Sequence, residues 1–402
     1  MRCARSPGDT RPRPVAPWHR SGVNPLRDVH GQVLVVRPPV PATVNKAGAN
    51  YKSEVPYLEY APRRAYDEWL TILEGIRACG GDAIYRFEAL DDPFLDRGDL
   101  HVDGDGNISP LGSREQLGRL ADVMTGRVFA ANGPWVTCDG ERLSAVMPNM
   151  LAHRQSEAAY YTDLLGELAG AAQLALAITQ NPHRWEGMAD VAAVGDRVVL
   201  TYAVPGHYDH ATTPKSSRST REGVAFAADA AGVADEARIY AELVYPHFHG
   251  DTVHFGARPS HGEPALVHFP GGLYGDDSAR VTATLGRDRI ITIDRADAVD
   301  EYAGNSRQVA NGVLVPDGVS AQFVTALGAL GLAVHRVPLF ELFGKAGGGP
   351  ACATLYLPRT LEIPAALPLR YSATLGEVRA RRDRIPERLT VDPGFFEGKS
   401  RG

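Results

Sequence analysis

The sequence predicts an α/β fold in which five repeated units close around a shared centre as a five-bladed α/β propeller. Each unit consists of an apolar strand, a loop, an amphipathic helix, a glycine or alanine break, and a second apolar strand. Such a unit cannot bury both faces of its small sheet alone, so several copies must pack together. The spacing between units is irregular, which argues against an open solenoid and favours one compact domain with radial pseudo-symmetry.

The five units are located by their apolar strands and by the signals at the ends of their helices. The first strands are predicted at 32–36, 143–147, 197–200, 265–269 and 312–315, and the second strands at 83–87, 174–178, 238–240, 289–293 and 333–337. The helices between them are predicted at 64–79, 155–168, 220–231, from 278, and from 321 to the glycine at 331. Ser219 and Ser320 are expected to cap the third and fifth helices, and Gly170 is expected to end the second.

The domain boundaries follow from changes in composition. Residues 29–365 are predicted to form the propeller domain, with an insertion at about 91–127 between the first and second units. Residues 1–28 are rich in arginine and proline and contain no apolar segment, so we expect a disordered leader. Residues 366–402 are charged and punctuated by proline, and we expect a C-terminal tail.

Composition excludes two classes of protein. The net charge is −6, from 42 basic and 48 acidic residues, and no basic stripe is present to bind a nucleic acid. The most apolar run, 169–178, is shorter than the roughly 18 residues that a membrane-spanning helix needs. The four cysteines, at positions 3, 79, 138 and 352, show no CxxC spacing, so we expect reduced thiols and a cytoplasmic protein.

Cys352 lies where a glycine-rich loop becomes an apolar strand. The loop contains three consecutive glycines, Gly347 to Gly349. Because glycine has no Cβ, a ligand can approach this backbone closely and the thiol can sit in a tight turn. A cysteine of the core needs no such access. The sequence therefore predicts Cys352 as a nucleophile, and the alternative is a small buried hydrophobic residue.

His249 and Asp251 lie two residues apart, so an extended backbone would place both side chains on one side. Under one hypothesis His247, His249 and Asp251 form a zinc site, because His-x-His-x-Asp resembles the opening ligands of metallo-β-lactamase-like hydrolases. That family has a further histidine directly after the aspartate, where this chain has Thr252. Under the second hypothesis His249 is a general acid/base and Asp251 is a fixed carboxylate beside it. A surface strand with polar residues is the third interpretation.

Two further segments place polar residues in turns. Glu186 and Asp190 are four residues apart around a turn of small residues, just before the apolar strand 191–194. An acid beside Gly187 can face a cavity without crowding, although an exposed turn would have the same composition. Asn132 belongs to an Asn-Gly-Pro sequence, which is typical of turns and predicts a turn before it indicates any functional role.

In chain order, these segments resemble the guanidine-modifying superfamily, which includes arginine deiminases, dimethylarginine dimethylaminohydrolases and arginine amidinotransferases. The resemblance covers roughly residues 32–360 and rests on short motifs whose order and separations together are specific. They are Phe129-Ala130-Ala131-Asn132, Arg154-Gln155-Ser156-Glu157, Glu186-Gly187-Met188-Ala189-Asp190, Arg218-Ser219-Thr220, His249-Gly250-Asp251-Thr252, Ala310-Asn311-Gly312-Val313 and Lys345-Ala346-Gly347-Gly348-Gly349-Pro350-Ala351-Cys352-Ala353-Thr354-Leu355. The superfamily has the fivefold α/β propeller called the pentein fold, in agreement with the five units.

The resemblance implies covalent catalysis with no cofactor and no metal. Cys352 would attack the central carbon of a guanidinium group to give a thiouronium adduct. His249 would protonate the departing amine and then deprotonate the incoming nucleophile. Glu186 and Asp251 would hold the guanidinium through charge-assisted hydrogen bonds.

The resemblance also implies the residues that bind the substrate, an arginine-like guanidino compound. Arg154 and Arg218 match positions where the superfamily directs arginine toward the substrate's α-carboxylate, and Asp190 is expected beside the substrate. Asn132 stands where many members have an aspartate that grips the guanidinium, and an amide offers no charge there. Water entering the adduct would make a hydrolase and an amine acceptor would make an amidinotransferase, and the sequence leaves both open.

Overall fold

The structure is a computed structural model. It describes residues 31–39, 59–86, 100–102, 107–110, 128–150, 154–155, 157–204, 206–207, 218–344, 347–383, 385, 387 and 389–391. The expected leader lies outside these residues, as does most of the expected insertion at 91–127.

Five three-stranded sheets of the same construction make up most of the described residues. In each sheet a central strand pairs parallel with one neighbour and antiparallel with the other. The central strands are β1 (Val33–Val36), β7 (Arg142–Met147), β10 (Arg197–Tyr202), β13 (Ala265–His268) and β16 (Gly312–Pro316). Their parallel neighbours are β3 (Asp82–Ile84), β8 (Ala175–Gln180), β11 (Arg238–Glu242), β14 (Ile290–Thr292) and β17 (Ala333–Val337). Their antiparallel neighbours are β18 (Thr354–Tyr356), β6 (Trp135–Cys138), β9 (Val191–Val194), β12 (His254–Ala257) and β15 (Arg307–Val309).

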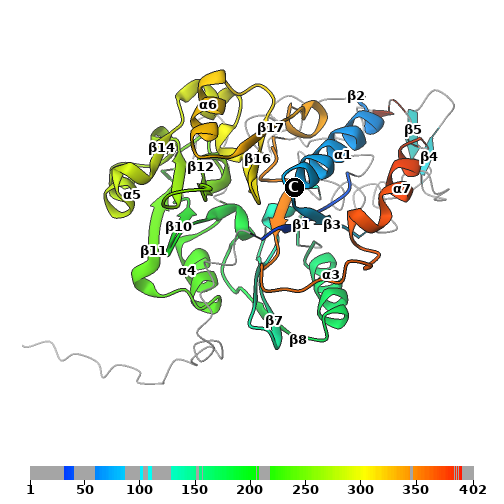
Figure 1. Cartoon of the computed structure of the whole chain (residues 1–402), viewed down its shortest axis with the longest axis horizontal. Helices are drawn as coiled ribbons and strands as arrows, with labels where there is room; N and C mark the ends of the chain where they lie inside the picture. The colour runs from blue at the N-terminus through cyan, green and yellow to red at the C-terminus, as the bar shows by residue number, and fades with distance from the viewer. Residues whose placement is uncertain are drawn as a thin grey trace, which may run out of the picture.

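One helix joins the two parallel strands of each sheet, because parallel strands cannot be linked by a tight turn. The helices are α1 (Pro62–Ala78), α3 (Glu157–Ala171), α4 (Arg221–Ala230), α5 (Asp277–Leu285) and α6 (Ala321–Ala329). In Figure 1 the sheets surround a common centre, and α3, α4, α5 and α6 lie on the outside. The five predicted strand–helix–strand units and the predicted α/β propeller are thereby confirmed.

The antiparallel strands face the centre of the ring. A cavity of about 30 Å³ is lined there by residues of β9, β12, β15 and β18, which belong to four different sheets. We call β6, β9, β12, β15 and β18 the inner strands. The predicted unit lacked this third strand. Four of the inner strands come before the central strand that opened the predicted unit, and β18 follows β1 only after more than 300 residues.

The pairing of β18 with β1 closes the ring. Val35 lies opposite Leu355 in an antiparallel register, so the first sheet combines strands from opposite ends of the domain. Both side chains are buried in one hydrophobic cluster. The last inner strand is therefore fixed beside the first unit.

The remaining described elements lie near α1 and the C-terminus. A four-stranded sheet has the order β2 (Glu59–Tyr60), β19 (Leu389–Val391), β5 (Asn107–Pro110) and β4 (Leu100–Val102). Helix α7 (Tyr371–Arg382) packs on α1, where the Tyr66 hydroxyl donates to the carbonyl of Val378 at 3.0 Å. The segment expected as a tail thus contributes a helix to the same core cluster as α1.

Two expected helix ends differ from the structure. Gly170 lies inside α3, which continues to Ala171. The N-cap of α4 is Thr220, whose hydroxyl accepts from the Gly223 amide, and Ser219 instead donates to a buried carboxylate described below. Ser320 caps α6 as predicted, by accepting from the Phe323 amide.

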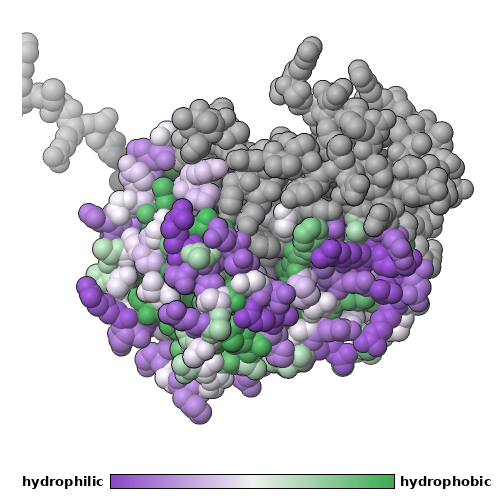
Figure 2. Space-filling model, turned by 90° about the horizontal axis from the view of Figure 1, so that it is seen from above, coloured by the Kyte–Doolittle hydropathy of each residue, from purple (hydrophilic) through white to green (hydrophobic). Residues whose placement is uncertain are grey.

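No helix in the described part of the chain is long and apolar enough to cross a bilayer. The face shown in Figure 2 is largely hydrophilic outside the grey atoms, with hydrophobic residues in small separate groups.

Replacing Leu355 by alanine tests the closure of the ring. The side chain is 2% exposed, so Leu355→Ala is expected to lower the free energy of unfolding by about 2–5 kcal/mol, measured by chemical denaturation. Leu330→Ala removes the same atoms from a partly exposed position and should cost clearly less. Equal losses at both positions would contradict a closing role for β18.

Candidate active site

Five short turns, one before each inner strand, meet at one end of the ring. Four of them are the 3-10 helices Ala130–Asn132, Gly187–Asp190, Gly250–Thr252 and Ala303–Asn305, and the fifth is the turn at 350–353. Neighbouring 3-10 helices contact one another in this order. The Ala351 amide donates to the carbonyl of Asn305, and the Ala131 amide donates to the carbonyl of Cys352, which completes the circle. The polar residues of the five turns therefore share one small region.

Cys352 is held in the turn before β18 and is 4% exposed. Its thiol donates to Oδ2 of Asp251 at 3.2 Å and accepts from Nδ2 of Asn305 at 3.0 Å. Burial raises the pKa of the thiol well above its usual value, and the nearby charge of Asp251 raises it further. At neutral pH the thiol of the ligand-free protein is therefore protonated.

The glycines before Cys352 serve packing. A Cβ on Gly348 would lie 2.0 Å from the ring of Phe129, and a Cβ on Gly349 would lie 2.9 Å from Oδ1 of Asn305. Both residues are buried, so their lack of a side chain lets the loop approach two neighbouring turns. The prediction that these glycines open the backbone to a ligand has no support in this arrangement.

His249 and Glu186 form a buried pair. Nε2 of His249 lies 2.7 Å from Oε2 of Glu186, and the two residues are 2% and 0% exposed. The same oxygen accepts from Nη1 of Arg218 at 3.1 Å. Burial alone would raise the pKa of Glu186, but Arg218 and then His249 outweigh it and hold that pKa far below its usual range. Glu186 is therefore a carboxylate throughout the physiological pH range.

Asp251 lies beside the thiol and is 8% exposed. Its Oδ2 accepts from Cys352, whereas its Oδ1 is buried without a hydrogen-bond partner in the described part of the chain. The backbone of His249 is extended, but Asp251 belongs to the 3-10 helix Gly250–Thr252, so the expectation of one extended segment from His249 to Asp251 is wrong. The surface-strand interpretation is also wrong, because both side chains are buried.

Asp190 connects several turns and strands. Its Oδ1 accepts from the hydroxyl of Thr201 at 2.8 Å and from the Gly250 amide at 2.9 Å, and its Oδ2 accepts from the hydroxyl of Ser219 at 2.5 Å. The hydroxyl oxygen of Ser219 in turn accepts from the Glu186 amide at 2.9 Å. This carboxylate, expected beside the substrate, is thus bonded on both oxygens to protein groups that position Glu186 and the turn carrying His249.

Asn132 and Arg154 are joined in a second buried network. Nη1 of Arg154 donates to Oδ1 of Asn132 at 2.6 Å, and Nδ2 of Asn132 donates to the carbonyl of Glu186 at 3.0 Å. Arg154 also forms two bonds with Glu157, which in turn accepts from Arg37 at 2.8 Å. The guanidinium of Arg154 is therefore engaged by buried protein groups.

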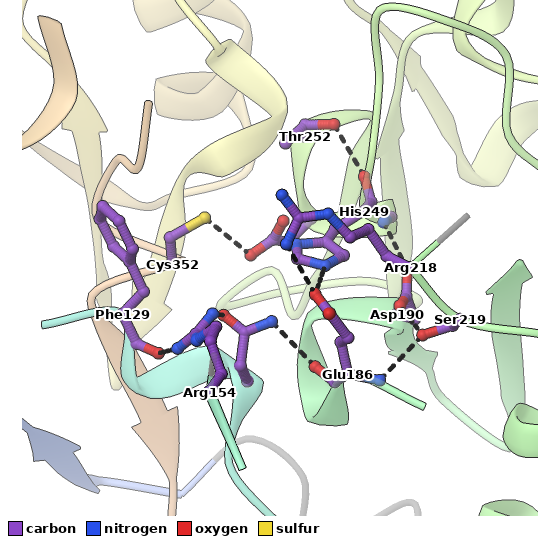
Figure 3. A network of polar contacts seen from close by, with 12 residues as sticks. Phe129, Arg154, Glu186, Asp190, Arg218, Ser219, His249, Thr252 and Cys352 are labelled. Atoms are coloured by element: carbon purple, nitrogen blue, oxygen red, sulfur yellow. Dashed lines mark hydrogen bonds and ion pairs between the residues drawn. The ribbon is translucent and has the colours of Figure 1, made fainter. Parts of the chain in front are cut away.

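Figure 3 shows Cys352, Arg154, Glu186, Arg218 and His249 directed toward a common centre from different turns and loops. The eight residues singled out from the sequence lie within this region or, in the case of Asp190, directly behind it. The guanidinium of Arg218 lies 5.6 Å from the centre of the Phe248 ring, and its side chain is 11% exposed.

Zinc binding by the His-x-His-x-Asp motif finds no support. Among the residues that the structure describes, no three His, Cys, Asp or Glu side chains form a group that could hold a metal ion. Nδ1 of His247 is 3.1 Å from the hydroxyl of Thr252, whereas His249 faces Glu186. The two histidines therefore have different partners.

Three functional neighbours were missed by sequence reasoning. Asn305 contacts the thiol but belongs to none of the motifs. Ser219 lay within the Arg218-Ser219-Thr220 motif and was expected to cap a helix. Glu157 is the last residue of the Arg154-Gln155-Ser156-Glu157 motif and had no predicted role. It accepts two hydrogen bonds from Arg154 and so holds that side chain in place. A polar residue just before an inner strand is the signal that identifies Asn305.

No protein-family model matches the sequence, and no curated protein matches it either. Solved structures do match. The N-terminal domain of ArgZ, an arginine dihydrolase from the ornithine–ammonia cycle in cyanobacteria, is 18% identical with a TM-score of 0.58, over 81% of this chain and 97% of that chain.

Two further solved structures are similar. AgrE, in a ternary complex with ornithine and NAD+, is 19% identical with a TM-score of 0.57, over 83% of this chain and 40% of that chain. A variant of dimethylarginine dimethylaminohydrolase, in an adduct with S-methyl-L-thiocitrulline, is 16% identical with a TM-score of 0.53, over 81% of this chain and 99% of that chain. At these identities the similarity concerns the fold. Together with the five sheets it shows that this chain has the pentein fold, the five-bladed α/β propeller of the guanidine-modifying superfamily that the sequence resembles.

Proposed function

We propose that this protein hydrolyses the guanidino group of arginine or of an arginine derivative through a covalent thiouronium adduct on Cys352. The observation that carries the proposal is that four groups lie together and buried: the Cys352 thiol bonded to the carboxylate of Asp251, and the imidazole of His249 paired with Glu186. These groups come from three different turns. Covalent catalysis at a guanidinium carbon needs a nucleophile, a proton carrier and counter-charges for the cation.

The charges of the site favour a cationic ligand. Glu186 is ionised, and Asp251 presents a buried oxygen with no hydrogen-bond donor among the described residues. A guanidinium has five or more N–H donors in one plane and can bond to two carboxylates at once. A guanidinium bound between Asp251 and Glu186 would place its central carbon near the thiol, and its positive charge would favour the thiolate.

The reaction proceeds in two halves. In the first, Cys352 releases its proton to solvent as the guanidinium binds, and the thiolate forms a bond to the guanidinium carbon. The bond from that carbon to one nitrogen breaks, and His249 gives its proton to the departing amine. In the second, a water molecule adds to the same carbon and His249 takes a proton from it. The carbon–sulfur bond then breaks and returns the thiolate.

Water is proposed as the second nucleophile because similar structures belong to hydrolases, an arginine dihydrolase and a dimethylarginine dimethylaminohydrolase. Both bind arginine-like ligands. Transfer of the amidino group to an amine acceptor uses the same protein groups, and it is the other outcome of the first experiment.

The structure suggests different roles for the two arginines. Arg154 is bonded to Glu157 and Asn132, so we assign it to positioning of the amide of Asn132. Arg218 donates to Glu186, and its side chain is 11% exposed, compared with 5% for that of Arg154. We therefore propose that Arg218 binds the α-carboxylate of the substrate.

Product analysis tests the reaction class. The protein is incubated with arginine or with N-methylated arginines, with and without added glycine as an amine acceptor, and products are identified by mass spectrometry. We expect loss of ammonia or methylamine with oxygen from ¹⁸O-labelled water in the product. Formation of an amidinated acceptor instead would establish a transferase, and no product from any guanidino compound would overturn the proposal.

Replacing Cys352 by serine tests the covalent step. We expect Cys352→Ser to abolish turnover with a melting temperature close to that of the unmodified protein, because a buried hydroxyl replaces a thiol of similar size. Intact-protein mass spectrometry of the acid-quenched unmodified protein should show an adduct that the serine variant lacks. Cys138→Ser alters another buried cysteine, outside the turns, and should retain activity. Full activity of Cys352→Ser would contradict the mechanism.

Removal of the Arg218 guanidinium tests carboxylate recognition. We expect Arg218→Ala to raise KM for arginine by about 10- to 100-fold, which corresponds to loss of a hydrogen bond between charged groups. The KM for agmatine, which lacks the carboxylate, should change much less. Arg221→Ala serves as the control, since Arg221 is exposed and its guanidinium stacks on Tyr240 at 5.3 Å. Equal effects of Arg218→Ala on both substrates would exclude carboxylate binding by Arg218.

A further inference from the structure

We propose that Asn305 is a catalytic residue whose side-chain amide holds the sulfur of Cys352 in place and stabilises its thiolate by hydrogen bonding. This inference deepens the proposed function, since it takes Cys352 as the nucleophile. It assigns a role to a residue that no sequence motif singled out.

The amide of Asn305 makes three hydrogen bonds within the site. Its Nδ2 donates to Sγ of Cys352 at 3.0 Å and to the carbonyl of Asp251 at 3.0 Å, and its Oδ1 accepts from the Cys352 amide at 3.0 Å. Both N–H groups and the carbonyl oxygen are thus used. Asn305 is 0% exposed, and a buried amide with all its groups bonded has one strongly preferred orientation.

The orientation of the amide follows from the chemistry of its partners. The carbonyl of Asp251 can only accept a hydrogen bond, and the backbone amide of Cys352 can only donate one. A flipped side chain would set oxygen against the Asp251 carbonyl and N–H against the Cys352 N–H. Nδ2 must therefore face the carbonyl of Asp251, and the sulfur receives its second N–H.

An N–H donor at the sulfur matters because the other polar neighbour is a carboxylate. Asp251 accepts from the thiol and would repel a thiolate, whereas the N–H of Asn305 bonds more strongly to a thiolate than to a thiol. Burial and Asp251 raise the pKa of Cys352, and the hydrogen bond from Asn305 acts in the opposite direction. Asn305 therefore lowers the free energy needed to form the nucleophile.

Close packing keeps Asn305 at this position. A Cβ on Gly304 would lie 2.7 Å from the carbonyl of Thr252, so the backbone of the Asn305 turn packs directly against the turn carrying Asp251. On the other side, Gly349 leaves room for the amide itself. Asn305 thus lies between the two turns that supply the thiol and the carboxylate.

The test measures the reactivity of the thiol and needs no substrate. Alkylation of Cys352 by iodoacetamide is followed by peptide mass spectrometry across pH 6 to 11, with circular dichroism to verify folding. In Asn305→Ala we expect the pH midpoint of alkylation to rise by about one unit, so that the rate at a fixed lower pH falls about tenfold. Asn305→Asp should shift the midpoint further, because it places a carboxylate at the sulfur.

Asn311→Ala is the matched control. Asn311 is exposed in the turn between β15 and β16, a few residues from Asn305, and its replacement should leave the alkylation profile unchanged. Gly349→Ala provides a second variant that keeps the asparagine. Its new Cβ would press on Oδ1 of Asn305, so the midpoint should rise in the same direction even if the Asn305 variants fail to fold.

A folded Asn305→Ala protein, or a folded Gly349→Ala protein, whose profile coincides with that of the unmodified protein overturns the inference. A purely structural asparagine would change the melting temperature and leave the thiol midpoint in place. If the midpoint shifts but no guanidino compound is turned over, the proposed function fails and the role of Asn305 at the thiol stands. Turnover of a guanidino compound with no shift in midpoint rejects the inference alone.

Discussion

The antiparallel pairing of β18 with β1 is the contact on which the rest of the site depends. It joins two parts of the chain more than 300 residues apart, at Val35 and Leu355, and it sets Cys352 just ahead of the last inner strand. From there the carbonyl of Cys352 reaches the Ala131 amide and its own amide reaches Asn305. Closure of the ring therefore positions the nucleophile. Hydrogen bonds between the backbones of adjacent turns then fix the other groups of the site relative to it.

The buried carboxylates of the site are stabilised by different kinds of partner. Glu186 is paired with a cation and an imidazole, while Asp190 is bonded to two hydroxyls and a backbone amide. Burial raises the pKa of Asp190 in spite of these bonds, and it raises that of Asp251 as well. Such buried carboxylates are costly to leave without partners. Asp251, with a buried oxygen that has no hydrogen-bond partner in the described residues, is the acid most in need of an external donor.

Much of the fold could be predicted because its strands and helices produce local patterns in the sequence. Apolar strands and helix-end signals located the parallel strands to within a few residues, and β17 (Ala333–Val337) was predicted with the bounds it has. One inner strand, β9 (Val191–Val194), was predicted as a strand, but none was assigned to the repeat. The pairing that makes an inner strand part of its sheet, such as that between β1 and β18, is a tertiary contact that local patterns do not reveal. The prediction that Ser219 caps a helix failed for a related reason. Its hydroxyl donates to Asp190, which is a tertiary contact, and does not bond to the helix end.

The candidate residues could be named from the sequence, but their partners could not. Residue type and motif order placed Cys352, His249 and Glu186 among the reactive groups. Nothing in the motif around Arg154 showed that Glu157 would occupy its guanidinium. Asn305 belongs to none of the motifs, since its importance arises from a contact with a residue 47 positions away.

The turns that carry the reactive groups occupy equivalent places in successive repeats. Glu186 and His249 each stand five residues before their inner strands, and Asn132 and Asp251 each stand three before theirs. Two polar positions therefore recur in different repeats. The position five residues before the inner strand holds an acid or a base, and the position three residues before it holds an amide or an acid. Because each repeat has its own sheet and helix, the functional group at such a position differs from one repeat to the next while the framework stays the same.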